Sequence, residues 1–192
     1  SYDRGATPIV VLVAADERIS RYRHPMPTAA RLERYALLVL CARRHGLVAN
    51  VTRAVHFGPI PGDLPRRQEA CARVDAAFLA ATRAGATAGE VLAAGMAAYA
   101  TAGYAEEWRL HHQGGATGYA SREWIAVPGS TQPIQDGMAF AWNPSITGTK
   151  SEDTVLLHSG GLDVLTQTGE WPQIDADAGG AVFSRPAIFQ RS

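Results

Sequence analysis

The sequence has few of the residues that hold small secreted or metal-rich proteins together. Its two cysteines, Cys41 and Cys71, are too few for a disulfide framework and lack the spacing of a metal-binding pair. We interpret both as packing residues. No apolar run approaches the roughly 20 residues of a membrane-spanning helix, and the first residues lack the pattern of a secretion signal. The sequence therefore predicts a soluble, cytoplasmic protein with no membrane partner.

Excess charge is also missing, because eighteen Lys and Arg residues balance eighteen Asp and Glu residues. A chain without net charge has no general field that draws it to nucleic acid or to an anionic membrane. We therefore expect a small-molecule partner and no nucleic acid. Lysine is nearly absent, since Lys150 stands alone among seventeen arginines. Lys150 is either retained for its amine or an ordinary surface charge.

The 192 residues suffice for one domain with a substantial core. Apolar, β-branched residues predict a buried strand over residues 9–14. Pro25 and Pro27 forbid a helix after it and hold His24 in a rigid, extended turn. Residues 35–43 and 47–57 flank a turn signal, and we predict that they form a β-hairpin.

Two helices are predicted after the hairpin. Asp63 is a candidate N-cap for the first, which stops around Gly85. Thr87 and Glu90 form the capping-box pattern of the second, which ends at Gly103. The glycine- and proline-rich remainder predicts short antiparallel strands at residues 108–119, 122–127, 138–143, 154–157 and 164–166. The sequence therefore predicts an α+β fold, with a curved antiparallel sheet backed by two helices.

Polar residues that can carry chemistry gather among glycines in the second half. Glycine lets a backbone approach a ligand closely, so a strand that carries His and Gln beside glycines can line a cleft. No single cluster is diagnostic. The clusters are the run His-His-Gln-Gly-Gly-Ala-Thr-Gly at 111–118, the pair Arg122 and Glu123, the pair Trp142 and Asn143, and the run at 150–153.

The order and spacing of these motifs resemble the creatinase and Xaa-Pro aminopeptidase (M24) family over nearly the whole chain. The strongest anchors are Gly-Met-Ala-Phe-Ala-Trp-Asn-Pro at 137–144, Glu-Asp-Thr-Val at 152–155, and Thr-Arg at 52–53 followed by Phe-Gly at 57–58. The resemblance implies the pita-bread fold, with residues 1–192 as one C-terminal catalytic-type domain. Its opening helices and the separate N-terminal domain of many members are absent. By analogy, it also implies a homodimer.

The resemblance implies a metal site that this chain has lost. Metal-using members hold two divalent ions with two aspartates from the hairpin, a histidine from the glycine-rich strand and two glutamates from the last strands. The matching positions here are the apolar residues near Leu40, Asn50, Gly115, Asn143 and Glu152. One glutamate and two neutral amides leave most of the charge of two divalent ions uncompensated. We therefore expect no metal and no cofactor.

Creatinase, as a member of the resembled family, hydrolyses a carbon–nitrogen bond without metal and uses a histidine in proton transfer. His24 matches a substrate-pocket histidine of the family and is the candidate general acid or base. Glu123 and Glu152 are the other candidate catalytic residues. Arg122 stands where relatives have a catalytic histidine, and a permanent cation there favours an anionic substrate. The candidate substrate-binding residues are Asn50, Arg53, His112, Gln113, Arg122, Trp142, Asn143 and Lys150.

Three interpretations stay open. The primary hypothesis is a metal-independent hydrolase that acts on a carbon–nitrogen bond of a small amidino, amide or peptide-like compound. The second is a non-catalytic member, a pseudoenzyme, that keeps the fold and binds a small molecule. The third is a metal-dependent Xaa-Pro aminopeptidase. Structural roles are also open for single residues, since His24 can be a hydrogen-bonded residue of a proline turn and the amides can simply fill a vacated metal pocket.

Overall fold

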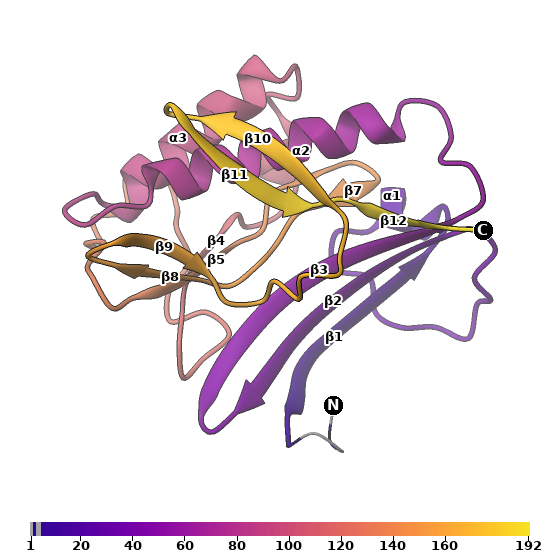
Figure 1. The fold of residues 1–192 in the computed structure, drawn as a ribbon, viewed down its shortest axis with the longest axis horizontal. Helices are drawn as coiled ribbons and strands as arrows, with labels where there is room; N and C mark the ends of the chain where they lie inside the picture. Colours follow the sequence, from indigo (N-terminus) through magenta and orange to yellow (C-terminus); the bar gives the residue numbers. More distant parts are fainter. Residues whose placement is uncertain (1, 3–4) are drawn as a thin grey trace.

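A long, curved sheet begins at the N-terminus and runs along one side of the molecule (Figure 1). The computed structural model describes residue 2 and residues 5–192. The predicted hairpin and the strand before it are confirmed, and the last strand of the chain joins them in parallel rather than antiparallel. In spatial order the strands are β1 (Thr7–Ala15), β2 (Tyr35–Arg44), β3 (Leu47–Phe57) and β12 (Ile188–Arg191).

The two faces of this sheet have different surroundings because side chains alternate along each strand. Val39 and Cys41 of β2 point inward and are buried, as is Leu12 of β1. On the outer face, Val11 and Leu38 are each 43% exposed. The inner face is therefore the one that can form a site with the rest of the chain.

Two helices, α2 (Leu64–Ala81) and α3 (Ala88–Thr101), pack against each other and cover a second sheet. Phe78 of α2 stacks on Trp142 of that sheet with ring centroids 5.1 Å apart. Gly95 of α3 is needed beside it, because a Cβ at this position would lie 2.1 Å from the Phe78 ring. The helices and the second sheet thus share the main core.

Both helices begin where the sequence predicted, but only α3 has the predicted side-chain cap. The capping box is confirmed, since Thr87 N–H donates to Glu90 Oε2 at 2.7 Å and Glu90 N–H donates to Thr87 Oγ1 at 3.3 Å. Asp63 is the N-cap residue of α2, as predicted, but its side chain makes no capping hydrogen bond. Its carboxylate instead accepts a hydrogen bond from Arg67 Nε at 2.8 Å, one turn along.

The second sheet is shorter than predicted, because its backbone is interrupted by glycine. The predicted strand at 108–119 is a 3₁₀ turn, η2 (Glu107–Leu110), followed by a four-residue strand, and Gly114 begins that strand at φ +100°. Residues 122–127 form no strand, although two of their N–H groups donate to carbonyls of the strand that begins at Gly114. In spatial order the sheet contains β4 (Gly114–Thr117), β5 (Ala139–Trp142), β8 (Val155–His158) and β9 (Gly161–Val164).

Several elements were not predicted at all. A small hairpin, β6 (Ser145–Ile146) and β7 (Thr149–Lys150), leads toward the site. A larger hairpin, β10 (Gln173–Ala178) and β11 (Ala181–Pro186), packs on α2 (Figure 1) through small residues that include Ala72, Ala76 and Ala176. Among the described residues, no helix combines the length and hydropathy needed to cross a lipid bilayer.

Candidate functional site

A cavity of about 230 Å³ lies between the inner face of the first sheet and the loops around the second. One wall is apolar and comes from β1 and β2, with Val10, Leu12, Val39 and Cys41. Val39 and Cys41 flank Leu40, so the apolar wall lies where the family resemblance places a metal-binding aspartate. Burial raises the pKa of the Cys41 thiol to about 11, and the nearby Glu152 carboxylate adds to the rise. Cys41 therefore contributes a neutral surface and no thiolate.

The opposite wall is polar, and its residues come from parts of the chain that are far apart in the sequence. Six of the candidate site residues converge here, together with Ser121. Because they come from an N-terminal loop and from four separate segments of the second half, only the folded chain brings them together. The six are His24, His112, Arg122, Asn143, Lys150 and Glu152.

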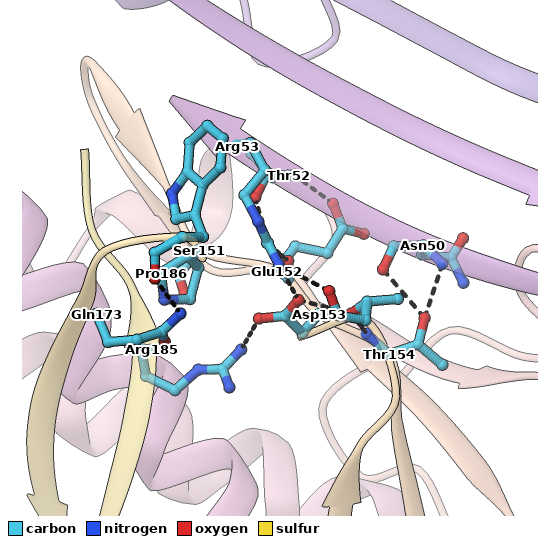
Figure 2. Close-up of polar contacts among 12 residues, drawn as sticks. Asn50, Thr52, Arg53, Ser151, Glu152, Asp153, Thr154, Gln173, Arg185 and Pro186 are labelled. Carbon is cyan, nitrogen blue, oxygen red and sulfur yellow. Dashed lines mark hydrogen bonds and ion pairs between the residues drawn. The ribbon is translucent and has the colours of Figure 1, made fainter. Parts of the chain in front are cut away.

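Glu152 is the retained acidic residue of the site, and positive groups of the chain surround it. Its carboxylate accepts hydrogen bonds from Arg122 Nη2 at 2.9 Å and from Thr52 Oγ1 at 2.6 Å (Figure 2), and Lys150 Nζ lies 3.5 Å away. Burial alone would raise the pKa of Glu152, but Lys150 and Arg122 together with these hydrogen bonds lower it to about 2. Glu152 is therefore an ionised, fully engaged carboxylate.

Arg53 and Asp153 face away from this cavity. Arg53 donates to Asp153 Oδ1 at 2.7 Å and to the carbonyl of Thr166 at 3.1 Å, so its guanidinium is used inside the fold (Figure 2). Asp153 Oδ2 accepts from Arg185 at 2.9 Å, and Arg185 also bonds Asp75 at 2.8 Å. The structure thus places Arg53, a candidate substrate-binding residue, in a buried structural network.

Three histidine rings lie together, and two of them, His24 and His112, line the cavity, whereas His111 does not. His112 Nδ1 accepts from the Gly114 N–H at 3.3 Å, which places its proton on Nε2. His111 Nε2 lies 3.0 Å from the carbonyl oxygen of Asn143 and donates to it. Burial lowers the pKa of His112 to about 4, with further lowering by Arg122 and Lys150, and burial lowers that of His111 well below its usual value. Both rings are neutral at pH 7.

His24 is the third ring and the one with uncommitted nitrogens. It stacks on His112 with centroids 5.4 Å apart and meets His111 edge-on at 5.7 Å. His24 is exposed, and within the described residues neither of its nitrogens makes a hydrogen bond. Burial and the cations Lys150 and Arg122 lower its pKa, against an opposing effect of Glu152. A neutral ring able to take a proton therefore lies at the cavity.

The loop that carries His24 is anchored on both sides, which sequence reasoning missed. Arg23 bonds Ser145 at 3.1 Å and Thr147 at 2.7 Å, and forms an ion pair with Glu107. The Pro25 carbonyl accepts from the Val13 N–H at 3.0 Å. The two prolines indicated a rigid turn, but no local pattern indicated the partners of Arg23, since they lie more than 80 residues away.

Three other candidate residues have structural roles outside the lining of the cavity. Gln113 accepts from the Tyr99 hydroxyl at 2.9 Å and donates to the Trp108 carbonyl at 2.9 Å. Trp142 lies in the core with its Nε1 bonded to Thr82. Glu123 is exposed and accepts N–H bonds from the loop at residues 119–120. None of the three lines the cavity.

Asn50 lies just behind the cavity. Its Nδ2 donates to Thr117 Oγ1 at 2.8 Å, whereas its Oδ1 is buried without a hydrogen-bond partner in the part of the chain that the structure describes. The Oδ1 of Asn143, a residue that lines the cavity, is likewise buried and unpartnered among those residues. Two of the positions matched to metal ligands therefore offer amide oxygens instead of carboxylates.

These side chains do not suit a pair of divalent ions. No group of three or more His, Cys, Asp or Glu side chains with suitable geometry is found among the described residues. A side chain is excluded at Gly115, the position matched to the metal-binding histidine, because a Cβ there would lie 2.2 Å from the Trp124 carbonyl oxygen. The one matched carboxylate, Glu152, already has two cationic partners. The donor set therefore disagrees with the family's metal centre.

Comparison with known proteins assigns the family. The profile of metallopeptidase family M24 matches residues 2–159. The chain belongs to metallopeptidase family M24. The resemblance inferred from the sequence motifs and the pita-bread fold are both confirmed.

Individual relatives of this M24 chain agree with that assignment. The chain is 31% identical over 140 residues to the agropine synthesis cyclase of Rhizobium rhizogenes, covering 68% of this chain and 35% of that protein. The prolidase of Pyrococcus furiosus is 22% identical with a TM-score of 0.78, over 87% of this chain and 52% of that one. The dipeptidase PepE of Mycobacterium ulcerans is 25% identical with a TM-score of 0.74, over 84% and 45% respectively. The chain thus spans about half the length of these solved structures.

Proposed function

We propose that this M24 member is a metal-independent acid–base catalyst that hydrolyses a carbon–nitrogen bond in a small amide, amidino or peptide-like compound. The observation that carries the proposal is His24, a neutral ring with two free nitrogens beside a carboxylate that two cations of the chain hold ionised. Imidazole exchanges protons near neutral pH, and His24 lines a cavity that can hold a substrate.

The reaction needs water as the co-reactant and one proton carrier. His24 takes a proton from water as the water oxygen bonds to the carbonyl or amidino carbon of the substrate. The protonated ring then gives this proton to the leaving nitrogen as the carbon–nitrogen bond breaks. His112 lines the same cavity, and its Nε2–H is the donor for the negative charge that develops during attack. Asn143 is an acceptor for an N–H of the substrate.

Metal independence is supported by two cationic side chains that pair with Glu152, the carboxylate that would otherwise be available to a metal ion. Arg122 and Lys150 supply positive charge to Glu152, and no side chain can be placed at Gly115 without moving the Trp124 backbone. We expect protein purified without chelator to contain no stoichiometric manganese, cobalt, zinc or iron by elemental analysis. We also expect a chelator to leave turnover unchanged. A stoichiometric metal content whose removal abolishes turnover would favour the Xaa-Pro aminopeptidase interpretation instead.

A ring-closing reaction is a second candidate, favoured by the printed name of the relative that is 31% identical, an agropine synthesis cyclase. The same groups serve it, because His24 can take a proton from a nucleophile within the substrate instead of from water. The ring closes as this nucleophile bonds to the carbon, and His24 returns the proton to the leaving nitrogen as the carbon–nitrogen bond breaks. Turnover in heavy-oxygen water separates the two. Hydrolysis places one heavy oxygen in the product, whereas ring closure places none.

The proposal is tested with a matched pair of substitutions. His24→Asn is expected to lower kcat by about 10²–10⁴-fold, the range of a general acid or base. His45→Asn is the control, because His45 is exposed, does not line the cavity and has φ +52°, a conformation that asparagine accepts. Kinetics on a panel of small amides and amidines measure both. Saturable binding with no chemical change across the panel would contradict catalysis and favour the pseudoenzyme interpretation.

A further inference from the structure

The cavity contains a cationic donor group that the fold leaves largely unused. Lys150 is 4% exposed, and its ammonium has the Glu152 carboxylate, at 3.5 Å, as its charged partner. An ammonium has three N–H donors, and one carboxylate at this distance does not occupy them all. Arg122 donates from Nη1 to the Ser121 carbonyl at 2.6 Å and from Nη2 to Glu152 at 2.9 Å, while its Nε is buried without a partner among the described residues. Both cations thus keep unused donors, and Lys150 is the one that has no second acceptor in the part of the chain that the structure describes.

The charges that line the cavity add up to a positive excess. Two permanent cations, Arg122 and Lys150, meet one carboxylate, Glu152, and the lowered pKa values keep His24 and His112 neutral. Both cations are more than four-fifths buried, so solvent screens this excess less than it would at a surface. An anionic group of a ligand would balance it.

Asn143 offers an acceptor, whereas Lys150 offers donors. Its side chain is 2% exposed, and its Oδ1 has no donor among the described residues. A buried carbonyl oxygen without a hydrogen bond is costly, so a ligand that brings an N–H or O–H group to it gains affinity. The Val10, Leu12 and Val39 side chains form an apolar surface opposite.

We propose that the cavity selects a small monocarboxylate that carries an N–H or O–H donor and an aliphatic group, but no ammonium group. The carboxylate pairs with Lys150, the donor bonds Asn143 Oδ1, and the aliphatic part packs on β1 and β2. An ammonium group is disfavoured because Glu152, the one carboxylate lining this cavity among the described residues, is already bound by two cations. The volume of about 230 Å³ lies below the roughly 300–1,000 Å³ of common ligand sites, which favours a compact molecule.

This inference rests on the proposed function for the choice of an amide as probe. N-acetyl-L-valine has the carboxylate, the amide N–H and a branched aliphatic group. N-acetyl-L-valinamide lacks the charge, N-acetyl-N-methyl-L-valine lacks the N–H, and L-alanyl-L-valine adds an ammonium. Titration calorimetry on the unaltered chain at neutral pH is expected to show binding of the first compound and at least tenfold weaker binding of the other three.

Variants locate the two contacts. Lys150→Met is expected to weaken binding of N-acetyl-L-valine about 10–100-fold, whereas Lys150→Arg, which keeps the charge, restores most of the affinity. Asn143→Leu is expected to remove the preference for N-acetyl-L-valine over its N-methyl analogue. If Lys150→Met does not fold, the acid and amide probes still decide the question on the unaltered chain.

The outcomes separate this inference from the proposed function. Equal or tighter binding of the valinamide or of the free dipeptide, or no measurable binding of N-acetyl-L-valine, overturns the inference. Turnover of neutral amides in the same assays would leave the proposed catalysis intact. Tight carboxylate binding by both the unaltered chain and His24→Asn, with no turnover by either, would sustain the inference and overturn the catalysis.

Discussion

Glu152 and Asp153 are neighbours in the sequence and are both buried, but Glu152 borders the cavity and Asp153 lies in a structural network. Asp153 belongs to a closed network in which Arg53 and Arg185 occupy its two oxygens and Arg185 also binds Asp75. Glu152 also meets two cations, but its cluster borders a cavity and leaves Lys150 with donors to spare. Equal charge and equal burial therefore do not separate a structural ion pair from a binding site. The presence of unused donors and acceptors does.

Side-chain alternation explains the separation. Residues 151–154 alternate between two sides of an extended segment. Ser151 bonds Asp75 of α2, and Asp153 bonds Arg185 of β11, whereas Glu152 bonds Thr52 of β3 on the other side (Figure 2). One extended segment thus serves the core on one side and the cavity on the other.

The largest loss of stability is expected when the Asp153 network is broken. Arg185→Met removes the cation shared by Asp75 and Asp153, and Asp75 keeps only the Ser151 hydroxyl. Breaking a buried pair in this way costs about 3–5 kcal/mol of the free energy of unfolding. Urea denaturation measures the loss. Arg66→Met, at an exposed position of α2, is the control and should change stability by less than about 0.5 kcal/mol.

A smaller loss of stability is expected when one cation is removed from Glu152 at the cavity. Arg122→Met leaves Glu152 with Lys150 and Thr52, so the buried carboxylate keeps a cation and a hydrogen bond. We expect a loss of about 1–3 kcal/mol in the same denaturation experiment, together with a rise in the pKa of Glu152. A loss as large as that of Arg185→Met would show that the two clusters do not differ in the way inferred here.

The smallest effect at neutral pH is that of His112, whose contribution to stability depends on pH. Burial lowers the pKa of His112 from 6.5 to about 4, so the unfolded chain binds a proton that the folded chain does not. Stability is therefore unaffected by this group above about pH 6.5 and falls as the pH decreases from there toward 4. His112→Asn should reduce the slope of unfolding free energy against pH in this window without abolishing it, because His24 and His111 are shifted in the same direction. An unchanged slope would contradict the burial of His112.

Local patterns predicted local structure well and failed where partners are distant. The hairpin and the capping box follow from neighbouring residues, and both are confirmed. Asp63 occupies the N-cap position of α2 as predicted, although its carboxylate binds Arg67 and makes no capping bond. The strand at residues 122–127 failed because this segment bonds to β4 at only two points. The hairpin β10–β11 was missed because its apolar contacts are mostly small alanines that meet α2, and alanine gives no strand pattern.

The sequence by itself determined the family, the fold class and the loss of metal-type side chains, since ordered motifs and residue identity suffice for these. It also named six residues that the structure brings to one cavity. Only the tertiary structure decided which charges are free. Arg53 is used inside the fold because it meets Asp153, 100 residues away, and His24 reaches the cavity beside His112, a ring from the other half of the chain. No local pattern encodes such distant partners.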